Sequence, residues 1–199
     1  MLTSLLATLA LLAPDTASLT EARRFYDAGR FTEVVAAADR ASATDPSRLR
    51  LRFLAALSHE KLNDAAAARQ IYAQLASDAD PAWADVGRSA TAAMDKHLDE
   101  ALAAVDRSVA TDPSLAEAHY QRGLVLMLRR QYEEASASFD KATAVDGTYA
   151  AAHYYGGLAN YRAKHIDRMA KHFEAFLALA PDAPERTEVE SIMRTVRGR

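Results

Sequence analysis

The 199-residue sequence contains no cysteine. This absence excludes disulfide bridges, thiolate zinc sites, iron–sulfur clusters and a cysteine nucleophile. The sequence also lacks any block of like charge, since its net charge is −3 and both signs are interspersed. A nucleic-acid-binding protein usually presents a basic patch or stripe that replaces the counterions on phosphates. We therefore expect no nucleic-acid partner.

No apolar run reaches the roughly 20 residues that a transmembrane helix needs. The longest, Leu2–Leu12, is followed by Pro14 and leaves two interpretations open. Residues 1–18 resemble an export signal, which favours an exported or periplasmic protein, but they lack a basic start and a good small-residue cleavage site. Alternatively, Leu2–Leu12 forms a retained N-terminal helix with its leucines on one face, which is compatible with a cytoplasmic protein.

A short motif marks the period of the chain. The sequence ATDPS occupies residues 43–47 and recurs at residues 110–114, which is a separation of two units of 33–34 residues. Aspartate is a good helix N-cap and proline suits the first helical turn, so Asp45-Pro46 and Asp112-Pro113 predict helix starts. Asp80-Pro81 occupies the corresponding junction between them. Arginine heavily outnumbers lysine and alanine is abundant, which indicates a GC-rich, bacterial genome.

Between these junctions each unit reads as two amphipathic helices. The clearest unit predicts helices over 115–128 and 132–144, joined by a turn at 129–131. The next unit aligns with it at an offset of 34 residues. The aligned pairs are Tyr120 with Tyr154, Gly123 with Gly157, and Phe139 with Phe173.

This period and pattern resemble the tetratricopeptide repeat (TPR), in which helix pairs stack into a superhelix. The repeat position at which two helices cross closely always holds a small residue in this sequence. A later position, which fills the space between repeats, usually holds a larger residue. The small residues are Ala22, Ala56, Ser89, Gly123 and Gly157, and the fillers are Ala38, Tyr72, Val105, Phe139 and Phe173. The sequence departs from the family pattern in two ways. His119, His153 and Arg52 replace a residue that is usually large and apolar, and the second unit aligns with the others only if one residue is deleted from the pattern.

The resemblance implies an all-α, right-handed superhelical solenoid of about five hairpins. The expected units are residues 15–48, 49–81, 82–115, 116–149 and 150–183, preceded by the apolar segment 1–14. Residues 184–199 form a predicted capping helix, because Val189, Ile192, Met193 and Val196 give it an apolar stripe that would cover the last repeat.

In the TPR family the first helix of each hairpin lines a concave groove that binds proteins or peptides. The residues that this resemblance places in the groove are Phe53, Val86, Tyr120, Leu124, Met127, Tyr154, Leu158 and Tyr161. Tyrosine and methionine suit a binding surface, although such a tyrosine equally often packs between neighbouring first helices. We expect a scaffold for a protein or peptide partner. The alternative is a self-association module whose groove is filled by its own N-terminal helix or by another copy.

Catalytic and metal-binding patterns are weak. His119 and His153 lie one repeat apart, but the nearby carboxylates are scattered and a metal site needs three or four converging ligands. Ser58 and His59 are adjacent on a helix and so point in different directions. Gly156-Gly157 is not followed by the lysine and hydroxyl residue of a phosphate loop. We therefore expect no enzyme activity, no metal and no cofactor.

Overall fold

The computed structural model describes residues 16–197. Within this range the chain is all-α, with eleven helices and no strand. The two interpretations of the segment 1–14 lie outside the described residues. The helices are α1 (Ala17–Asp27), α2 (Phe31–Arg40), α3 (Arg48–Lys61), α4 (Ala65–Ala76), α5 (Pro81–Met94), α6 (Leu98–Thr111), α7 (Ala116–Leu128), α8 (Tyr132–Val145), α9 (Ala150–Arg162), α10 (Ile166–Leu179) and α11 (Arg186–Arg197).

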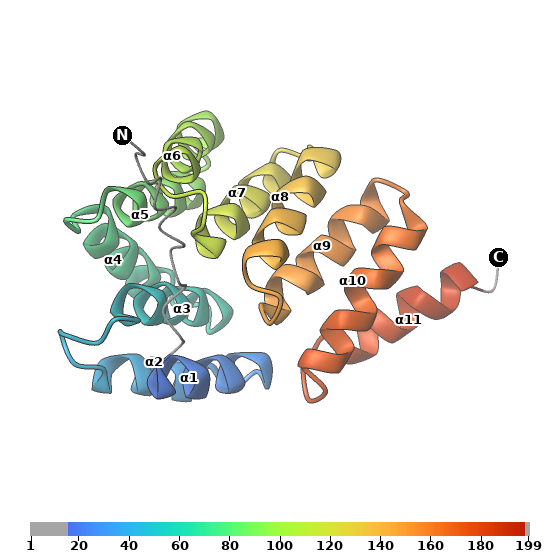
Figure 1. The fold of residues 1–199 in the computed structure, drawn as a ribbon, viewed down its shortest axis with the longest axis horizontal. Coiled ribbons are helices and arrows are strands. Elements are labelled where there is room, and N and C mark those ends of the chain that lie inside the picture. Colours follow the sequence, from blue (N-terminus) through green and yellow to red (C-terminus); the bar gives the residue numbers. More distant parts are fainter. Residues whose placement is uncertain (1–15, 198–199) are drawn as a thin grey trace, which may run out of the picture.

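The helices form five successive antiparallel hairpins, α1/α2 to α9/α10, followed by the single helix α11. The hairpins stack side by side, and Figure 1 shows them following an arc that carries the first and the last pair back toward each other. The fold is therefore the solenoid of helical hairpins with a terminal helix that the repeat pattern predicts.

The turn within each hairpin has the same backbone form. One residue per turn has a positive φ, between 60° and 71°, and the amide that follows it donates to a carbonyl near the end of the first helix. In the fourth hairpin, Arg130 has φ 61°, and the amide of Gln131 donates to the carbonyl of Leu126 at 2.9 Å. Glycine suits this conformation, but only the first turn uses it, at Gly29. The four turns that place a residue other than glycine in the left-handed conformation therefore incur a small conformational strain energy.

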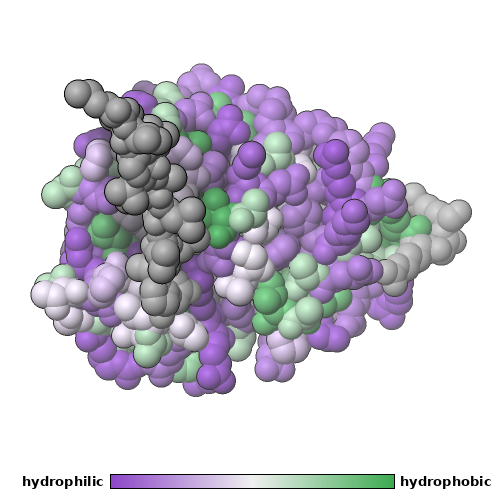
Figure 2. Space-filling view, in the orientation of Figure 1, coloured by the Kyte–Doolittle hydropathy of each residue, from purple (hydrophilic) through white to green (hydrophobic). Residues whose placement is uncertain are grey.

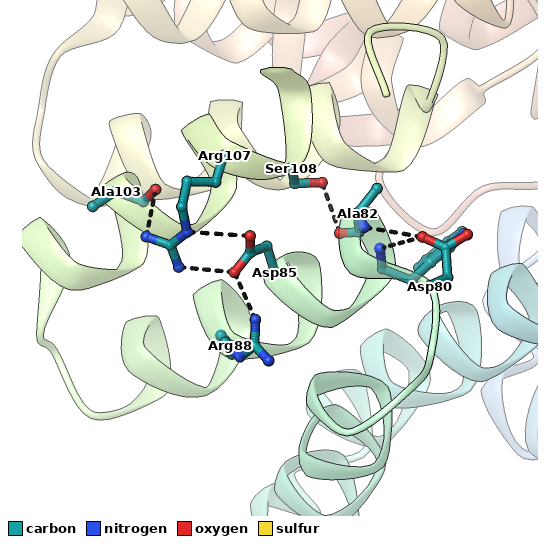
Figure 3. Close-up of polar contacts among 8 residues, drawn as sticks. Asp80, Ala82, Asp85, Arg88, Ala103, Arg107 and Ser108 are labelled. Atoms are coloured by element: carbon teal, nitrogen blue, oxygen red, sulfur yellow. Dashed lines mark hydrogen bonds and ion pairs between the residues drawn. The ribbon is translucent and has the colours of Figure 1, made fainter. Parts of the chain in front are cut away.

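The helix starts between hairpins follow the predicted mechanism at one junction. The Asp80 carboxylate accepts hydrogen bonds from the amides of Ala82 and Trp83, at 2.9 and 3.1 Å, and Pro81 opens α5 (Figure 3). The prediction was wrong at the two ATDPS motifs. There the helices begin two to three residues after the proline, at Arg48 and Ala116. These aspartates instead accept from the amide two residues on, which forms an Asx turn that leads into the helix.

Polar contacts also join the two helices of a hairpin. In the third, the guanidinium of Arg107 on α6 donates two hydrogen bonds to the Asp85 carboxylate on α5, at 2.8 and 3.2 Å (Figure 3). The buried Ser108 hydroxyl donates to the Ala82 carbonyl at 2.8 Å. These contacts fix the register of α5 against α6 at the surface and in the interior.

Close helix crossings repeat with the sequence period. A Cβ at Gly123 would lie 2.6 Å from two ring carbons of Phe139, and Gly157 has the same relation to Phe173. Both phenylalanine rings are fully buried. The small residue on the first helix therefore makes room for the large residue on the second, as the alignment of the two units predicts.

Helix α11 covers the end of the solenoid. Val189 and Met193 are buried against Met169 and Phe176 of α10, in a cluster that also includes Tyr154 of α9. The Tyr154 hydroxyl donates to the Glu188 carboxylate at 3.1 Å. The predicted apolar stripe thus faces the last hairpin.

Candidate partner-binding groove

The first helices of the hairpins face the inside of the arc, where side chains from distant units meet. Phe53 of α3 makes an edge contact with Tyr120 of α7, with ring centroids 6.4 Å apart. Tyr120 in turn contacts Tyr149, just before α9, and Tyr155 within it. A single apolar core runs from α1 to α9. The concave side is therefore largely filled by the protein's own aromatic residues.

The structure divides the eight residues predicted to line the groove. Phe53, Val86 and Tyr120 expose 1%, 0% and 1% of their surface, and Tyr154 is buried as well. Phe53, Val86 and Tyr120 belong to the core that runs from α1 to α9, whereas Tyr154 belongs to the separate cluster with α10 and α11. Leu124, Met127 and Leu158 are half-buried, and Tyr161 is exposed. A partner can reach the second group without disturbing the fold, so their role in binding stays a prediction.

An ionic cluster around the buried Glu117 ties the first two hairpins to the fourth. Arg23 of α1 lies 2.8 Å from the Asp146 carboxylate, and its guanidinium stands over the Tyr149 ring. Both Arg23 and Arg50 of α3 also approach Glu117, at 3.7 and 3.4 Å. Glu117 is 3% exposed, and burial raises the pKa of its carboxyl group even though the two arginines lower it. The cluster joins units that are far apart in the sequence and closes the arc on one side.

A second set of contacts joins the first two hairpins to the segment before α11. The Lys61 ammonium lies 3.0 Å from the Glu185 carboxylate. Gly29, in the first turn, stands against Pro184, since a Cβ there would lie 3.0 Å from the Pro184 ring. Asp27 lies in the same region, and burial together with the Glu185 charge raises its pKa to about 7, against the opposing effect of Arg23. The two ends of the solenoid therefore touch, and the array forms a nearly closed ring.

An apolar cavity of about 450 Å³ remains open where the first helices end. Three of the predicted groove residues line it: Tyr120, Leu124 and Met127. The remaining lining residues are Tyr26, Leu57, Glu60, Lys61, Leu128 and Tyr155. Leu128, the last residue of α7, is 58% exposed at its edge. The two charged residues are engaged elsewhere, because Glu60 accepts a 2.5 Å hydrogen bond from Tyr72 and Lys61 pairs with Glu185.

The sequence did not identify Tyr155 or Lys61 as part of this site. Tyr155 neighbours a predicted groove residue, and its ring stacks on Phe139 at 6.0 Å between centroids. Lys61 lines the cavity at the place where the first two hairpins contact the segment before α11, through its ion pair with Glu185. No local sequence signal distinguishes these residues, since both depend on contacts between units that are far apart in the chain. Tyr26 and Glu60 occupy the same repeat position as Met127 and could have been found from that position.

Three of the six histidines contact oxygen atoms of the protein's own helices and loops. His119 and His153 occupy equivalent places, and each ring nitrogen contacts the carbonyl oxygen six residues earlier, Pro113 at 2.9 Å and Gly147 at 3.2 Å. His172 contacts the Asp140 carboxylate at 2.8 Å. Across residues 16–197, no group of three or more histidine, aspartate or glutamate side chains could hold a metal ion. No helix in the described part of the chain is long and apolar enough to cross a membrane.

The fold and its inward-facing first helices define a helical-repeat protein built from paired antiparallel helices. Two family models with the description "Tetratricopeptide repeat" match the sequence, at residues 19–82 and 116–149. The chain belongs to the tetratricopeptide repeat family. No curated protein matches the sequence.

Solved structures of TPR proteins share this fold at low sequence identity. TTC0263, a thermophilic TPR protein in Thermus thermophilus, is 20% identical with a TM-score of 0.62, over 88% of this chain and 97% of that one. The first TPR domain of Spaghetti (RPAP3), bound to the HSP90 peptide SRMEEVD, is 19% identical with a TM-score of 0.57, over 60% and 96%. YrrB, a TPR protein with an unusual peptide-binding site, is 16% identical with a TM-score of 0.50, over 92% and 91%. At this sequence identity, the similarity to these three proteins shows a shared fold only.

Proposed function

We propose that this protein is a non-catalytic scaffold that binds a protein or peptide partner through the cavity at the ends of its first helices. The observation that carries the proposal is the open apolar cavity of about 450 Å³ edged by Leu128. Its volume lies within the roughly 300–1,000 Å³ usual for binding pockets. An accessible apolar wall of leucine and methionine suits an anchoring side chain of a partner.

The closed ring determines which part of the groove is available. A peptide lying along the whole concave face would have to displace Phe53 and Tyr120 from the core, which opposes that mode of binding. An anchor residue entering between Leu57 and Leu124 needs no such displacement, because these residues already line an open cavity. The proposal therefore limits binding to the cavity on the turn side of the ring, which side chains of α1, α3, α7 and α9 line.

Affinity capture from the source cells tests this proposal with a matched pair of variants. Leu128→Glu places a charge at the cavity edge, whereas Leu179→Glu does so at the end of α10, outside this cavity, at a residue that is 37% exposed. Both positions are exposed enough that folding, checked by circular dichroism, is expected to persist. We expect a partner that intact protein and Leu179→Glu retain and Leu128→Glu loses.

Equal capture by all three chains would contradict a role for the cavity. Capture of further copies of this chain alone, lost in Leu128→Glu, would assign the cavity to self-association instead. Sedimentation of the purified protein over a range of concentrations distinguishes that outcome.

A further inference from the structure

The cavity at the ends of the first helices contains polar groups among its apolar walls. Its aliphatic lining residues are Leu57, Leu124, Met127 and Leu128. Its aromatic lining residues come from three different first helices, and they are Tyr26, Tyr120 and Tyr155. We call these three residues the tyrosine cluster. Each of them carries a hydroxyl group that can both donate and accept a hydrogen bond.

The hydroxyl group of Tyr120 opens on the cavity. The Tyr120 ring packs against Phe53 and Phe139, with centroids 6.4 and 5.9 Å away, and the residue is only 1% exposed. Within residues 16–197 its hydroxyl hydrogen-bonds no other group, yet its oxygen is not sealed from solvent. Because Tyr120 lines this cavity and is buried elsewhere, the cavity is the place where a ligand can reach that oxygen.

The other two members of the tyrosine cluster are close to this hydroxyl. Burial, together with the nearby Tyr26 and Tyr155 side chains, raises the pKa of Tyr120 well above its usual value. Tyr26 is 9% exposed, and its hydroxyl also has no hydrogen-bond partner among residues 16–197. The Lys61 charge acts on Tyr155 and opposes the effect of burial, which raises the pKa of that residue. The three side chains therefore remain neutral hydrogen-bond donors at neutral pH.

The lining offers these donors no free acceptor. Glu60 is the carboxylate of the lining, and it accepts a hydrogen bond from Tyr72. An aliphatic side chain that filled the cavity would displace water from the tyrosine cluster and leave its hydroxyls without partners, which is unfavourable. The best occupant therefore combines a large apolar body with an oxygen atom at its end.

We infer that the group of the partner that enters this cavity is a tyrosine side chain, whose hydroxyl joins the tyrosine cluster. Its ring would contact Leu124 and Met127, and its oxygen can accept a hydrogen bond as well as donate one. A tryptophan is less suitable, because its indole N–H only donates and cannot serve the Lys61 ammonium. This inference rests on the proposed function and adds the identity of the anchoring residue.

The visible outer surface offers such an anchor less enclosure. Figure 2 shows a face of the molecule that is mainly hydrophilic, with separate small apolar patches toward its middle. A large aromatic side chain loses more contact with water in an open cavity of about 450 Å³ than on small separate patches.

Selection from a random peptide library, displayed on phage and presented to the full chain, tests the inference. We expect the enriched peptides to share a tyrosine and to be lost in Leu128→Glu. A synthesised consensus peptide should bind the intact chain roughly tenfold more tightly than its analogue with phenylalanine in place of that tyrosine.

Variants of the protein locate the source of this preference. The triple variant Tyr26→Phe, Tyr120→Phe, Tyr155→Phe keeps the three rings and removes their hydroxyls, so its preference for the tyrosine peptide should fall to about twofold or less. The single variant Tyr120→Phe, which removes a hydroxyl without a protein partner, should keep the fold and lose part of the preference. The matched control is Tyr132→Phe on α8, outside the cavity, which should retain the tenfold preference. Circular dichroism checks the folding of each variant.

The results that would overturn the inference differ from those that would overturn the proposed function. Enriched peptides that depend on Leu128 but share no tyrosine, or equal binding of the two synthesised peptides, would refute the tyrosine anchor and leave the cavity proposal standing. A tenfold preference that persists in both Tyr120→Phe and the triple variant would refute the role of the tyrosine cluster. No enriched peptide that depends on Leu128 would refute the inference and the proposed function together.

Discussion

The close approach of Gly123 to Phe139 allows a sharp prediction about stability. In a helix, replacing glycine by alanine normally stabilises by about 1 kcal/mol. Here the new Cβ would lie 2.6 Å from two ring carbons of Phe139, where ordinary contact requires 3.4 Å or more. The ring is fully buried between Tyr120 and Tyr155, with centroids 5.9 and 6.0 Å away, and has little space to move.

We expect Gly123→Ala to destabilise the protein by about 2 kcal/mol, because overpacking of roughly 1–3 kcal/mol or more outweighs the gain in helix propensity. The melting temperature should fall by roughly 4–8 °C for a domain of this size. Urea denaturation followed by circular dichroism measures the change in unfolding free energy.

Two further variants isolate the cause. Gly147→Ala is the matched control, since its Cβ would meet nothing closer than the Thr143 carbonyl oxygen at 3.8 Å, and its stability should change by less than about 0.5 kcal/mol. Combining Gly123→Ala with Phe139→Leu, which shortens the obstructing side chain, should cost less than the sum of the two single changes. A Gly123→Ala variant as stable as the parent would show that α7 and α8 yield easily, and would refute the argument from tight crossing.

Three other predictions concern the closure of the ring and its cap. Because the folded pKa of Asp27 is raised to about 7, folding favours its protonated form, and the stability it contributes is lost as pH rises from about 4 to 7. Asp27→Asn should therefore stabilise the protein at pH 8 by on the order of 1–3 kcal/mol and change its stability little at pH 4. Equal unfolding free energies of variant and parent in urea titrations at both pH values would contradict this. Glu117→Ala should destabilise by about 3 kcal/mol, since it leaves Arg23 and Arg50 without their shared buried carboxylate; a thermal melt unchanged within about 1 °C would refute the cluster's role. Deleting α11 from Arg186 onward should uncover the apolar surface beneath Val189 and increase binding of a hydrophobic dye, and unchanged fluorescence would show that the cap is dispensable.

The fold was predictable because its determinants are local and repeat. The helical spacing of apolar residues and the paired offsets of Gly123 with Gly157 and Phe139 with Phe173 specify each hairpin and its stacking. The helix starts were predicted less well, because Asp45 and Asp112 form turns two and three residues before the helix cap, and the same residue types serve both arrangements.

The candidate site was predictable only in part, for a different physical reason. The family resemblance placed Phe53 and Tyr120 in the concave groove, but whether an inward side chain meets solvent or another unit depends on the curvature of the whole array. That curvature brings together residues such as Lys61 and Glu185, which are 124 residues apart in the sequence. The sequence around a residue does not identify the distant residue that it contacts. The core and cavity residues of the concave face could therefore not be distinguished from the sequence alone.

The contact between the two ends of the solenoid also limits how this chain can vary in length. An open repeat array can gain or lose a hairpin with a change only at the new interface, because each unit touches its neighbours alone. Here a sixth hairpin, inserted anywhere between α2 and α7, would separate Arg23 from Asp146 and Gly29 from Pro184. The number of repeats is thus a structural constant of this protein, as the number of blades is in a propeller.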